Sequence, residues 1–201
     1  LDRIERLPEI QGSDPKIQLE ALLALARVTG VCPQHRTNTT PPVDTVMRDK
    51  LLAAVIAIDA SKLDAPSQLT QQRTLQIILN RFGRPNDATV QKLITAIDPL
   101  FPSESAELNW LLCDTLAWLE SPTVAEKAIA LIEAAPTQEE QMQYARSIRM
   151  LKAGWTDELH TAYFEWFLKA ANYRGGVSFE KFIQFIRADA VASLSETQQE
   201  S

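Results

Sequence analysis

The residues best suited to metal chemistry are a cysteine and a histidine three positions apart, Cys32 and His35. A thiolate and an imidazole can together hold a soft metal ion, but a closed site needs further ligands. The sequence contains only two cysteines and two histidines, so no second closely spaced pair completes the set. We therefore favour an ordinary loop at this position and predict no metal site.

The remaining candidates for acid–base chemistry are few. His160 lies beside Leu159 and Tyr163 in a helical pattern, where a surface or partly packed histidine is more common than a catalytic base. Glu139 and Glu140 fall in the expected first turn of a helix, where carboxylates complement the helix dipole. No metalloprotease, Walker, nucleophile-elbow or calcium-loop motif occurs, and no C-x-x-C-H site for haem attachment. We predict no catalytic residue and no cofactor within this chain.

Two basic features are better explained by structure than by binding of phosphate or RNA. Arg146, Arg149 and Lys152 form a short stripe that suits a solvated face or a contact with an acidic neighbouring domain. Arg174-Gly175-Gly176 contains the triplet of RNA-binding tails, but a single copy in an acidic chain favours a tight corner between two helices.

The densest unusual feature is a run of aromatic residues after position 154. Its members are Trp155, Tyr163, Phe164, Trp166, Phe167, Tyr173, Phe179, Phe182 and Phe185. Such a cluster can form a ligand cage, but more often it is the core that closes a stack of helices or the seam to a next domain. We predict a seam between domains or with a partner, made by Trp155, Tyr163, Trp166, Phe167, Tyr173 and Arg174.

The elements that must position these residues are helices. Apolar side chains recur at i, i+3, i+4 and i+7, as in Leu75, Ile78, Leu79 and Phe82. We expect about ten helices, at 2–10, 14–29, 44–59, 67–82, 86–98, 103–119, 122–134, 138–153, 156–171 and 177–194, the last with a break near Asp189. Asp14-Pro15 and Ser121-Pro122 resemble an N-cap followed by proline, and Thr137 with Glu140 a capping box. Gly30, Gly83 and Gly154 are expected left-handed helix ends.

The spacing of the helices indicates a repeat. Helices open at Thr45, Thr89, Thr123 and Thr156, in steps of 44, 34 and 33 residues. Units of this length with two helices are typical of α-solenoids. The fold class expected is therefore all-α, an α-solenoid of antiparallel helix pairs of the HEAT or armadillo kind. An irregular helical bundle is the alternative. One polar, proline-rich segment, 31–43, interrupts the period and predicts a long surface loop that is either functional or merely mobile.

Composition excludes several classes of function. The 201 residues include 20 basic and 26 acidic ones, a net charge of −6, which disfavours nucleic acid and anionic membranes as partners. No apolar run is long enough for a transmembrane segment, and no signal peptide is present. The chain opens with Leu1 in a helical pattern, so we interpret 1–201 as one helical domain cut from a longer protein, with 1–100 and 101–201 as possible sub-blocks.

The second half resembles a known family. The most specific segments are Ala135–Gln141 (APTQEEQ), Tyr163–Phe167 (YFEWF) and Tyr173–Gly176 (YRGG) followed by Ser178-Phe179. Over residues 101–194 the chain is similar to the HEAT-like helical region of large exported bacterial proteins. In these proteins a membrane-bound-dehydrogenase-type module precedes the helices and a c-type cytochrome domain follows them. The first hundred residues are similar only as generic helix pairs.

This resemblance implies a non-catalytic scaffold or docking domain inside a larger, haem-containing redox protein. It implies a periplasmic or otherwise exported location, haem c in the parent protein but not in this chain, and neighbouring domains or another protein as partners. Two alternatives stay open. One is an independent peptide- or protein-binding α-solenoid. The other is a small helical enzyme or ligand-binding domain that uses the cluster near Tyr163 and Trp166.

Overall fold

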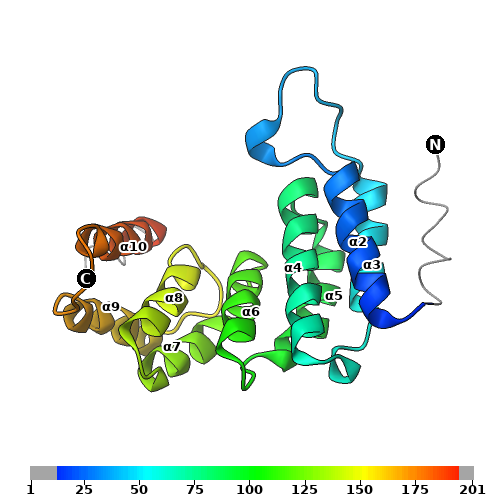
Figure 1. Ribbon diagram of the computed structural model, residues 1–201. Helices are drawn as coiled ribbons and strands as arrows, with labels where there is room; N and C mark the ends of the chain where they lie inside the picture. The colour runs from blue at the N-terminus through cyan, green and yellow to red at the C-terminus, as the bar shows by residue number, and fades with distance from the viewer. Residues whose placement is uncertain (1–12, 195–201) are drawn as a thin grey trace. The chain divides into compact units, whose positions relative to one another are not determined.

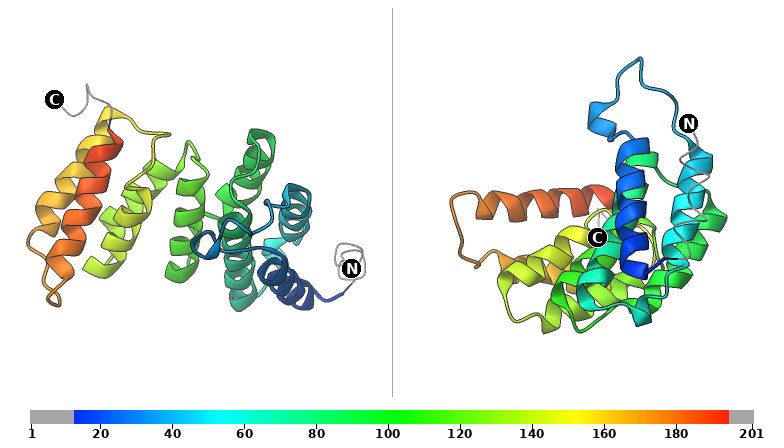
Figure 2. Two further views of the ribbon diagram at one scale, coloured as in Figure 1. Left: turned by 90° about the horizontal axis from the view of Figure 1, so that it is seen from above. Right: turned by 45° about the vertical axis from the view of Figure 1, so that its right-hand side comes forward.

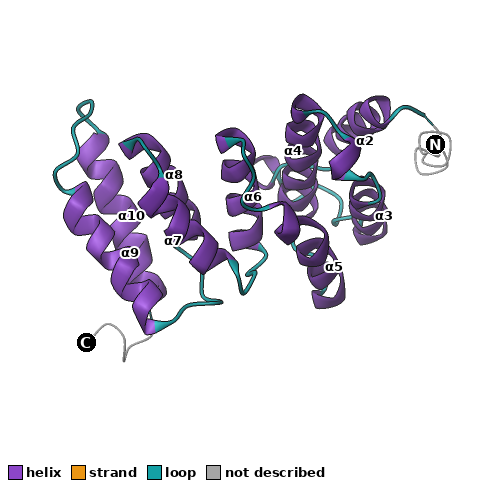
Figure 3. Ribbon diagram, turned by 90° about the horizontal axis from the view of Figure 1, so that it is seen from below, coloured by secondary structure: helices purple, strands orange, loops and turns teal. Residues whose placement is uncertain are grey.

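The computed structural model describes residues 13–194, and over this range the chain is all helical, with no strand (Figures 1 and 3). Its nine α-helices are α2 (Pro15–Thr29), α3 (Thr45–Ile56), α4 (Ala65–Phe82), α5 (Asp87–Ile97), α6 (Ala106–Trp118), α7 (Val124–Ala134), α8 (Gln138–Ile148), α9 (Asp157–Ala170) and α10 (Phe179–Ser193). None of the described helices is both long and apolar enough to cross a membrane.

The all-α prediction is confirmed, and the nine helices overlap the expected ranges, with ends within about a turn except that α8 stops at Ile148, five residues before the expected end. The helix expected at 2–10 falls outside the described residues. One expectation about helix continuity is wrong, since α10 runs unbroken past Asp189.

Helix starts follow simple capping chemistry. Asp14, Asp64 and Thr137 are N-caps whose side chains accept a hydrogen bond from a backbone N–H of the first turn. The Ser121-Pro122 prediction is wrong. Helix α7 begins at Val124 after Thr123, and Ser121 is buried, with its hydroxyl donated to the Asp98 carboxylate.

The expected left-handed glycines are only partly confirmed. Gly83 ends α4 with φ of +75°, and Gly154, in the α8–α9 connection, has φ of +77°. Gly30 is extended instead, with φ of −96°. It ends α2 against Phe82 and Arg81, where a Cβ would overlap both side chains, so close packing explains this glycine.

The chain divides into two compact units, Leu1–Ala96 and Ile97–Ser201. In the first unit, α4 packs against both α2 and α3, as the two views of Figure 2 show. The core between them is apolar and fully buried, and includes Leu19, Leu51, Leu52, Leu75 and Ile78.

The second unit is built in two layers. Helix α8 lies between α6 and α10, while α7 packs beside α9 and against α8. Small side chains such as Ala125, Ala128 and Ala145 are completely buried, which lets these helices approach closely. Helices α9 and α10 lie side by side (Figure 3). This arrangement leaves one side of α6, α8 and α10 uncovered by the α7–α9 layer.

Candidate functional site

The first candidate, the pair Cys32 and His35, lies in the segment between α2 and α3. His35 ends a single 3-10 turn, Pro33–His35, and is exposed. The Cys32 thiol is half-buried and lies 3.8 Å from the Asn80 side-chain oxygen. Within residues 13–194 no group of three or more histidine, cysteine or acidic side chains is arranged to hold a metal ion.

The same segment is closed by hydrogen bonds at its base and near its tip. The Arg81 guanidinium donates to the carbonyls of Arg27 (2.9 Å) and Gly30 (2.6 Å), which fixes the point where α2 ends. Arg36 donates to the Pro41 carbonyl at 3.1 Å, and the Thr40 hydroxyl accepts from the Thr37 N–H at 2.8 Å. The predicted long surface loop is therefore an ordered, polar protrusion of the first unit (Figure 1).

Three members of the aromatic cluster form part of the packed core of the second unit. Tyr163, Trp166 and Phe167 on α9 are buried, and their rings meet edge to face, with centroids 5.2 Å apart for Tyr163–Phe167 and 4.9 Å for Trp166–Phe167. The Tyr163 hydroxyl donates to the Ala145 carbonyl of α8 at 2.7 Å. Burial raises the pKa of this phenol above its usual range. The polar atom of the buried tyrosine is thus used inside the protein.

Gln141 of α8 organises the polar edge of this cluster. Its side-chain oxygen accepts from the Trp166 indole at 3.3 Å and from the Tyr173 hydroxyl, while its NH₂ group donates to the Ala135 carbonyl at 2.9 Å. Gln138, one turn earlier, exchanges two hydrogen bonds with the backbone of Arg174. Hydrogen bonds to α8 therefore hold four of the six predicted seam residues, namely Tyr163, Trp166, Tyr173 and Arg174.

The other predicted seam residues are at least partly accessible. Trp155 and Tyr173 are half-buried and Arg174 is exposed. The imidazole of His160 stacks on the Trp155 indole with centroids 4.6 Å apart, and burial lowers the pKa of His160. Burial also raises the pKa of Tyr173. Stacked, desolvated rings of this kind stabilise the start of α9.

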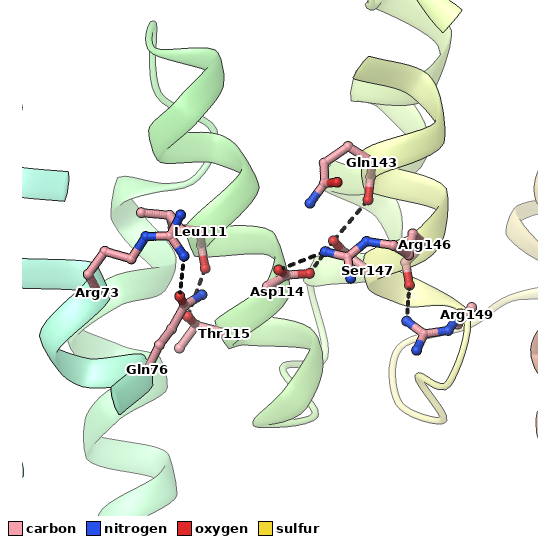
Figure 4. A network of polar contacts seen from close by, with 9 residues as sticks. All are labelled: Arg73, Gln76, Leu111, Asp114, Thr115, Gln143, Arg146, Ser147 and Arg149. Carbon is pink, nitrogen blue, oxygen red and sulfur yellow. Dashed lines mark hydrogen bonds and ion pairs between the residues drawn. The ribbon is translucent and has the colours of Figure 1, made fainter. Parts of the chain in front are cut away.

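A feature that sequence reasoning missed is a polar ladder across α6, α8 and α10, whose α6–α8 part is drawn in Figure 4. The Asp114 carboxylate of α6 accepts from the Arg146 guanidinium at 3.2 Å and from the Ser147 hydroxyl, both on α8. The Arg149 guanidinium donates to the Arg146 carbonyl at 2.6 Å and to the Asp189 carboxylate of α10 at 2.8 Å. The charged side chains of the ladder stay roughly one-third to one-half exposed.

Large, accessible apolar side chains lie close to the ladder residues along the chain. Phe182 and Phe185 lie seven and four residues before Asp189 in α10, and Trp118 lies four residues after Asp114 in α6. Met150 lies just beyond the end of α8. The exposed fractions are 66% for Phe185, 55% for Met150, 45% for Trp118 and 40% for Phe182. We call the ladder and these four residues together the α6–α8–α10 face.

Only the basic residues of this face could be recognised in the sequence. Arg146 and Arg149 stand out as basic, but their partners are 32 and 40 residues away and belong to other helices. The chemistry of this face is suited to binding another polypeptide. It presents paired charges, amide and hydroxyl groups and accessible apolar side chains, the mixture found at protein interfaces.

No protein-family model, no curated protein and no solved structure matches this chain.

Proposed function

We propose that this chain is a non-catalytic helical docking domain and that the α6–α8–α10 face of its second unit is the contact surface. The observation that carries this proposal is the combination on one face of a bonded polar ladder with four accessible apolar side chains. The ladder links α6, α8 and α10 to one another. A partner therefore binds to a surface that is already ordered, and the entropic cost of binding is lower.

The finer architecture is part of the same proposal. The repeat step of 33–44 residues and the two-layered packing of α6–α10 support a solenoid of the HEAT or armadillo kind. Such solenoids present one continuous layer of helices to a partner. The exposed layer of α6, α8 and α10 is of this type.

The setting that we propose is a larger, exported redox protein that carries haem c outside this chain. Its support is the resemblance over residues 101–194 alone. A pyridine–alkali absorption spectrum of the longer protein tests it. A covalent haem band supports this setting. A spectrum without such a band refutes the redox and periplasmic parts of the proposal but does not affect the docking role.

The docking role is tested by site-specific photo-crosslinking in the longer protein. A photo-reactive phenylalanine analogue replaces Phe185 on the face, or Leu168 of α9 as a control that is 75% exposed but lies off the face. We expect a specific crosslinked product from position 185 and not from position 168. Equal labelling at both positions would refute the assignment of the surface.

The same experiment separates two forms of the proposal. A crosslink to another part of the same polypeptide indicates an internal scaffold that holds neighbouring domains. A crosslink to a second protein favours the independent protein-binding solenoid, for which the accessibility of Phe185 and Met150 is the specific support.

A further inference from the structure

We infer that the outward side of α10 is a second docking surface, and that its occupant is an acidic amphipathic helix of a partner polypeptide. This inference goes beyond the proposed function, because the surface shares no residue with the α6–α8–α10 face.

The outward side of α10 is a continuous, hollowed surface. The buried side of the helix is marked by Ile183, Ile186 and Ala190. Five exposed residues follow the i, i+3, i+4, i+7, i+8 spacing of a different face of the same helix. They are Gln184, Arg187, Ala188, Val191 and Ala192. The same five residues line an open hollow of about 490 Å³, which we call the α10 hollow.

The α10 hollow is elongated along the axis of its helix. From Gln184 to Ala192 the helix rises about 12 Å, since each residue of an α-helix adds ~1.5 Å. Ala188 and Ala192 lie one turn apart and have small side chains, which lets the backbone of a second helix approach closely. The shape therefore fits a rod-like occupant that lies along α10.

The few polar groups of the α10 hollow favour a helical occupant over an extended one. Only Gln184 and Arg187 offer polar side chains there, and the Gln184 NH₂ group already donates to the Glu180 carboxylate at 3.1 Å. An extended segment would turn some of its backbone N–H and C=O groups toward Ala188 and Val191, which cannot pair with them. A helix pairs these groups within itself.

The local charge makes the occupant acidic. Arg187 is the charged residue of the α10 hollow, and Lys181 is exposed less than two turns before it. Within residues 13–194 the structure gives neither cation an ion-pair partner. The carboxylate of Glu180 is bonded by Gln184, and that of Asp189 belongs to the ladder. A carboxylate at the edge of the docked helix can pair with the Arg187 guanidinium.

A random-peptide display library tests the inference. The peptides are about 14 residues long, which is ~21 Å as a helix and spans the α10 hollow. The library is selected on the whole chain and counter-selected on Ala188→Trp, whose bulky side chain fills the hollow. We expect enrichment of peptides with a helical apolar stripe and acidic residues beside it. Enrichment of basic or proline-rich peptides, or of none that depends on Ala188, would overturn the inference.

A charge reversal tests the role of Arg187 with an enriched peptide. Fluorescence anisotropy with the whole chain measures its affinity, which Arg187→Glu should lower about tenfold. A second peptide, with lysine at the acidic positions, should bind R187E more tightly than wild type. Leu168→Ser, at a site on α9 that is 75% exposed, should leave both affinities unchanged. Equal affinity of wild type and R187E for the acidic peptide would contradict the pairing. Circular dichroism checks that each variant is folded.

Sedimentation velocity separates a partner helix from a second copy of this chain. A dimer of the wild-type chain that A188W abolishes would show that a second copy covers the α10 hollow, and would refute the inference. A wild-type chain that stays monomeric while binding the acidic peptide supports it. The crosslinking test at Phe185 concerns the other surface, so neither result alters its interpretation.

Discussion

Asp98 gathers donors from three side chains of the α6–α7 connection and α7. Its carboxylate accepts from the hydroxyls of Ser121 (3.2 Å) and Thr123 and from the Lys127 ammonium at 2.8 Å. Lys127 also donates to the Asp98 backbone carbonyl at 2.9 Å. One residue therefore ties the segment before α6 to the start of α7.

Replacing Asp98 by asparagine should lower the free energy of unfolding by about 1–2 kcal/mol, since solvent screening reduces the value expected of a fully buried pair. Urea unfolding followed by circular dichroism measures it. The control is Asp59→Asn, in an exposed ion pair with Lys62, where we expect no measurable change. Equal losses in the two variants would contradict this role of Asp98.

The same carboxylate predicts a pH dependence. Burial opposes ionisation of Asp98, but the bonds from Lys127 and Thr123 outweigh it, so its pKa lies below the ordinary value of 3.8. Its folded pKa is thus lower than its unfolded pKa. The stabilisation is complete above pH 3.8 and is lost as pH falls through the folded pKa. The difference in stability between wild type and D98N should therefore shrink in that acidic range.

At the scale of single residues, the side chains that are buried on a helix could be predicted. Ion pairs between residues far apart in the sequence could not. The buried aromatic residues follow from their periodicity on α9. The pairing of Arg149 with Asp189 depends on how α8 and α10 pack, which no local pattern contains. The two arginines were consequently interpreted as a basic stripe, although each is paired with a carboxylate.

In the connection from α8 to α9, Gly154 lies very close to another part of the backbone. Gly154 has φ of +77°, and a Cβ there would overlap the backbone carbonyl of Pro122. Gly154→Ala should therefore destabilise the second unit by about 2–4 kcal/mol, from left-handed strain and from overlap together. Thermal unfolding measures this loss. Gly176→Ala, where a Cβ has open space, should be nearly neutral, and a similar loss there would argue against the explanation.

Gln141 connects α8 to the α7–α8 connection, to α9 and to the residues after α9. Gln141→Leu keeps the approximate volume but leaves the Trp166 indole, the Tyr173 hydroxyl and the Ala135 carbonyl without this partner. We expect a loss of about 2–4 kcal/mol, since several buried polar groups lose their bonds at once. Gln143→Leu, half-exposed on the same helix, is the matched control and should change stability little. Chemical denaturation of both variants decides the point.

Element positions could be predicted because capping and periodicity are local. Thr137 at the start of α8 and Asp14 at the start of α2 are examples. The Ser121-Pro122 signal failed because Asp98, more than twenty residues earlier, binds the Ser121 hydroxyl, so this side chain serves a tertiary contact and not a helix start. The prediction of a left-handed Gly30 failed for the same kind of reason, because Phe82 and Arg81 of another helix pack against this residue.

On the scale of the whole molecule, each of the two units has its own buried core. We therefore expect residues 13–96 and 97–194, expressed separately, each to give a helical circular dichroism spectrum and a cooperative thermal transition. A fragment that stays unfolded alone but folds when mixed with the other would show that the cores depend on each other.

The all-α class was predictable at this scale because apolar periodicity is helical along almost the whole chain. Possible sub-blocks 1–100 and 101–201 were expected, and the structure divides the chain between Ala96 and Ile97, at the end of α5. The haem-protein setting stays a prediction, since it depends on resemblance and not on packing.

The Arg81 bonds at the base of the 31–43 segment bear on how this segment can change in length and composition during evolution. Since α4 holds the carbonyls of Arg27 and Gly30, the end of α2 is defined without help from the residues that follow. Length and composition of the protrusion are then free to drift, because doubling a flexible loop costs only about 0.6 kcal/mol. Insertion of a short epitope after Asn38 should leave the melting temperature almost unchanged, which makes this segment a natural attachment point for a label.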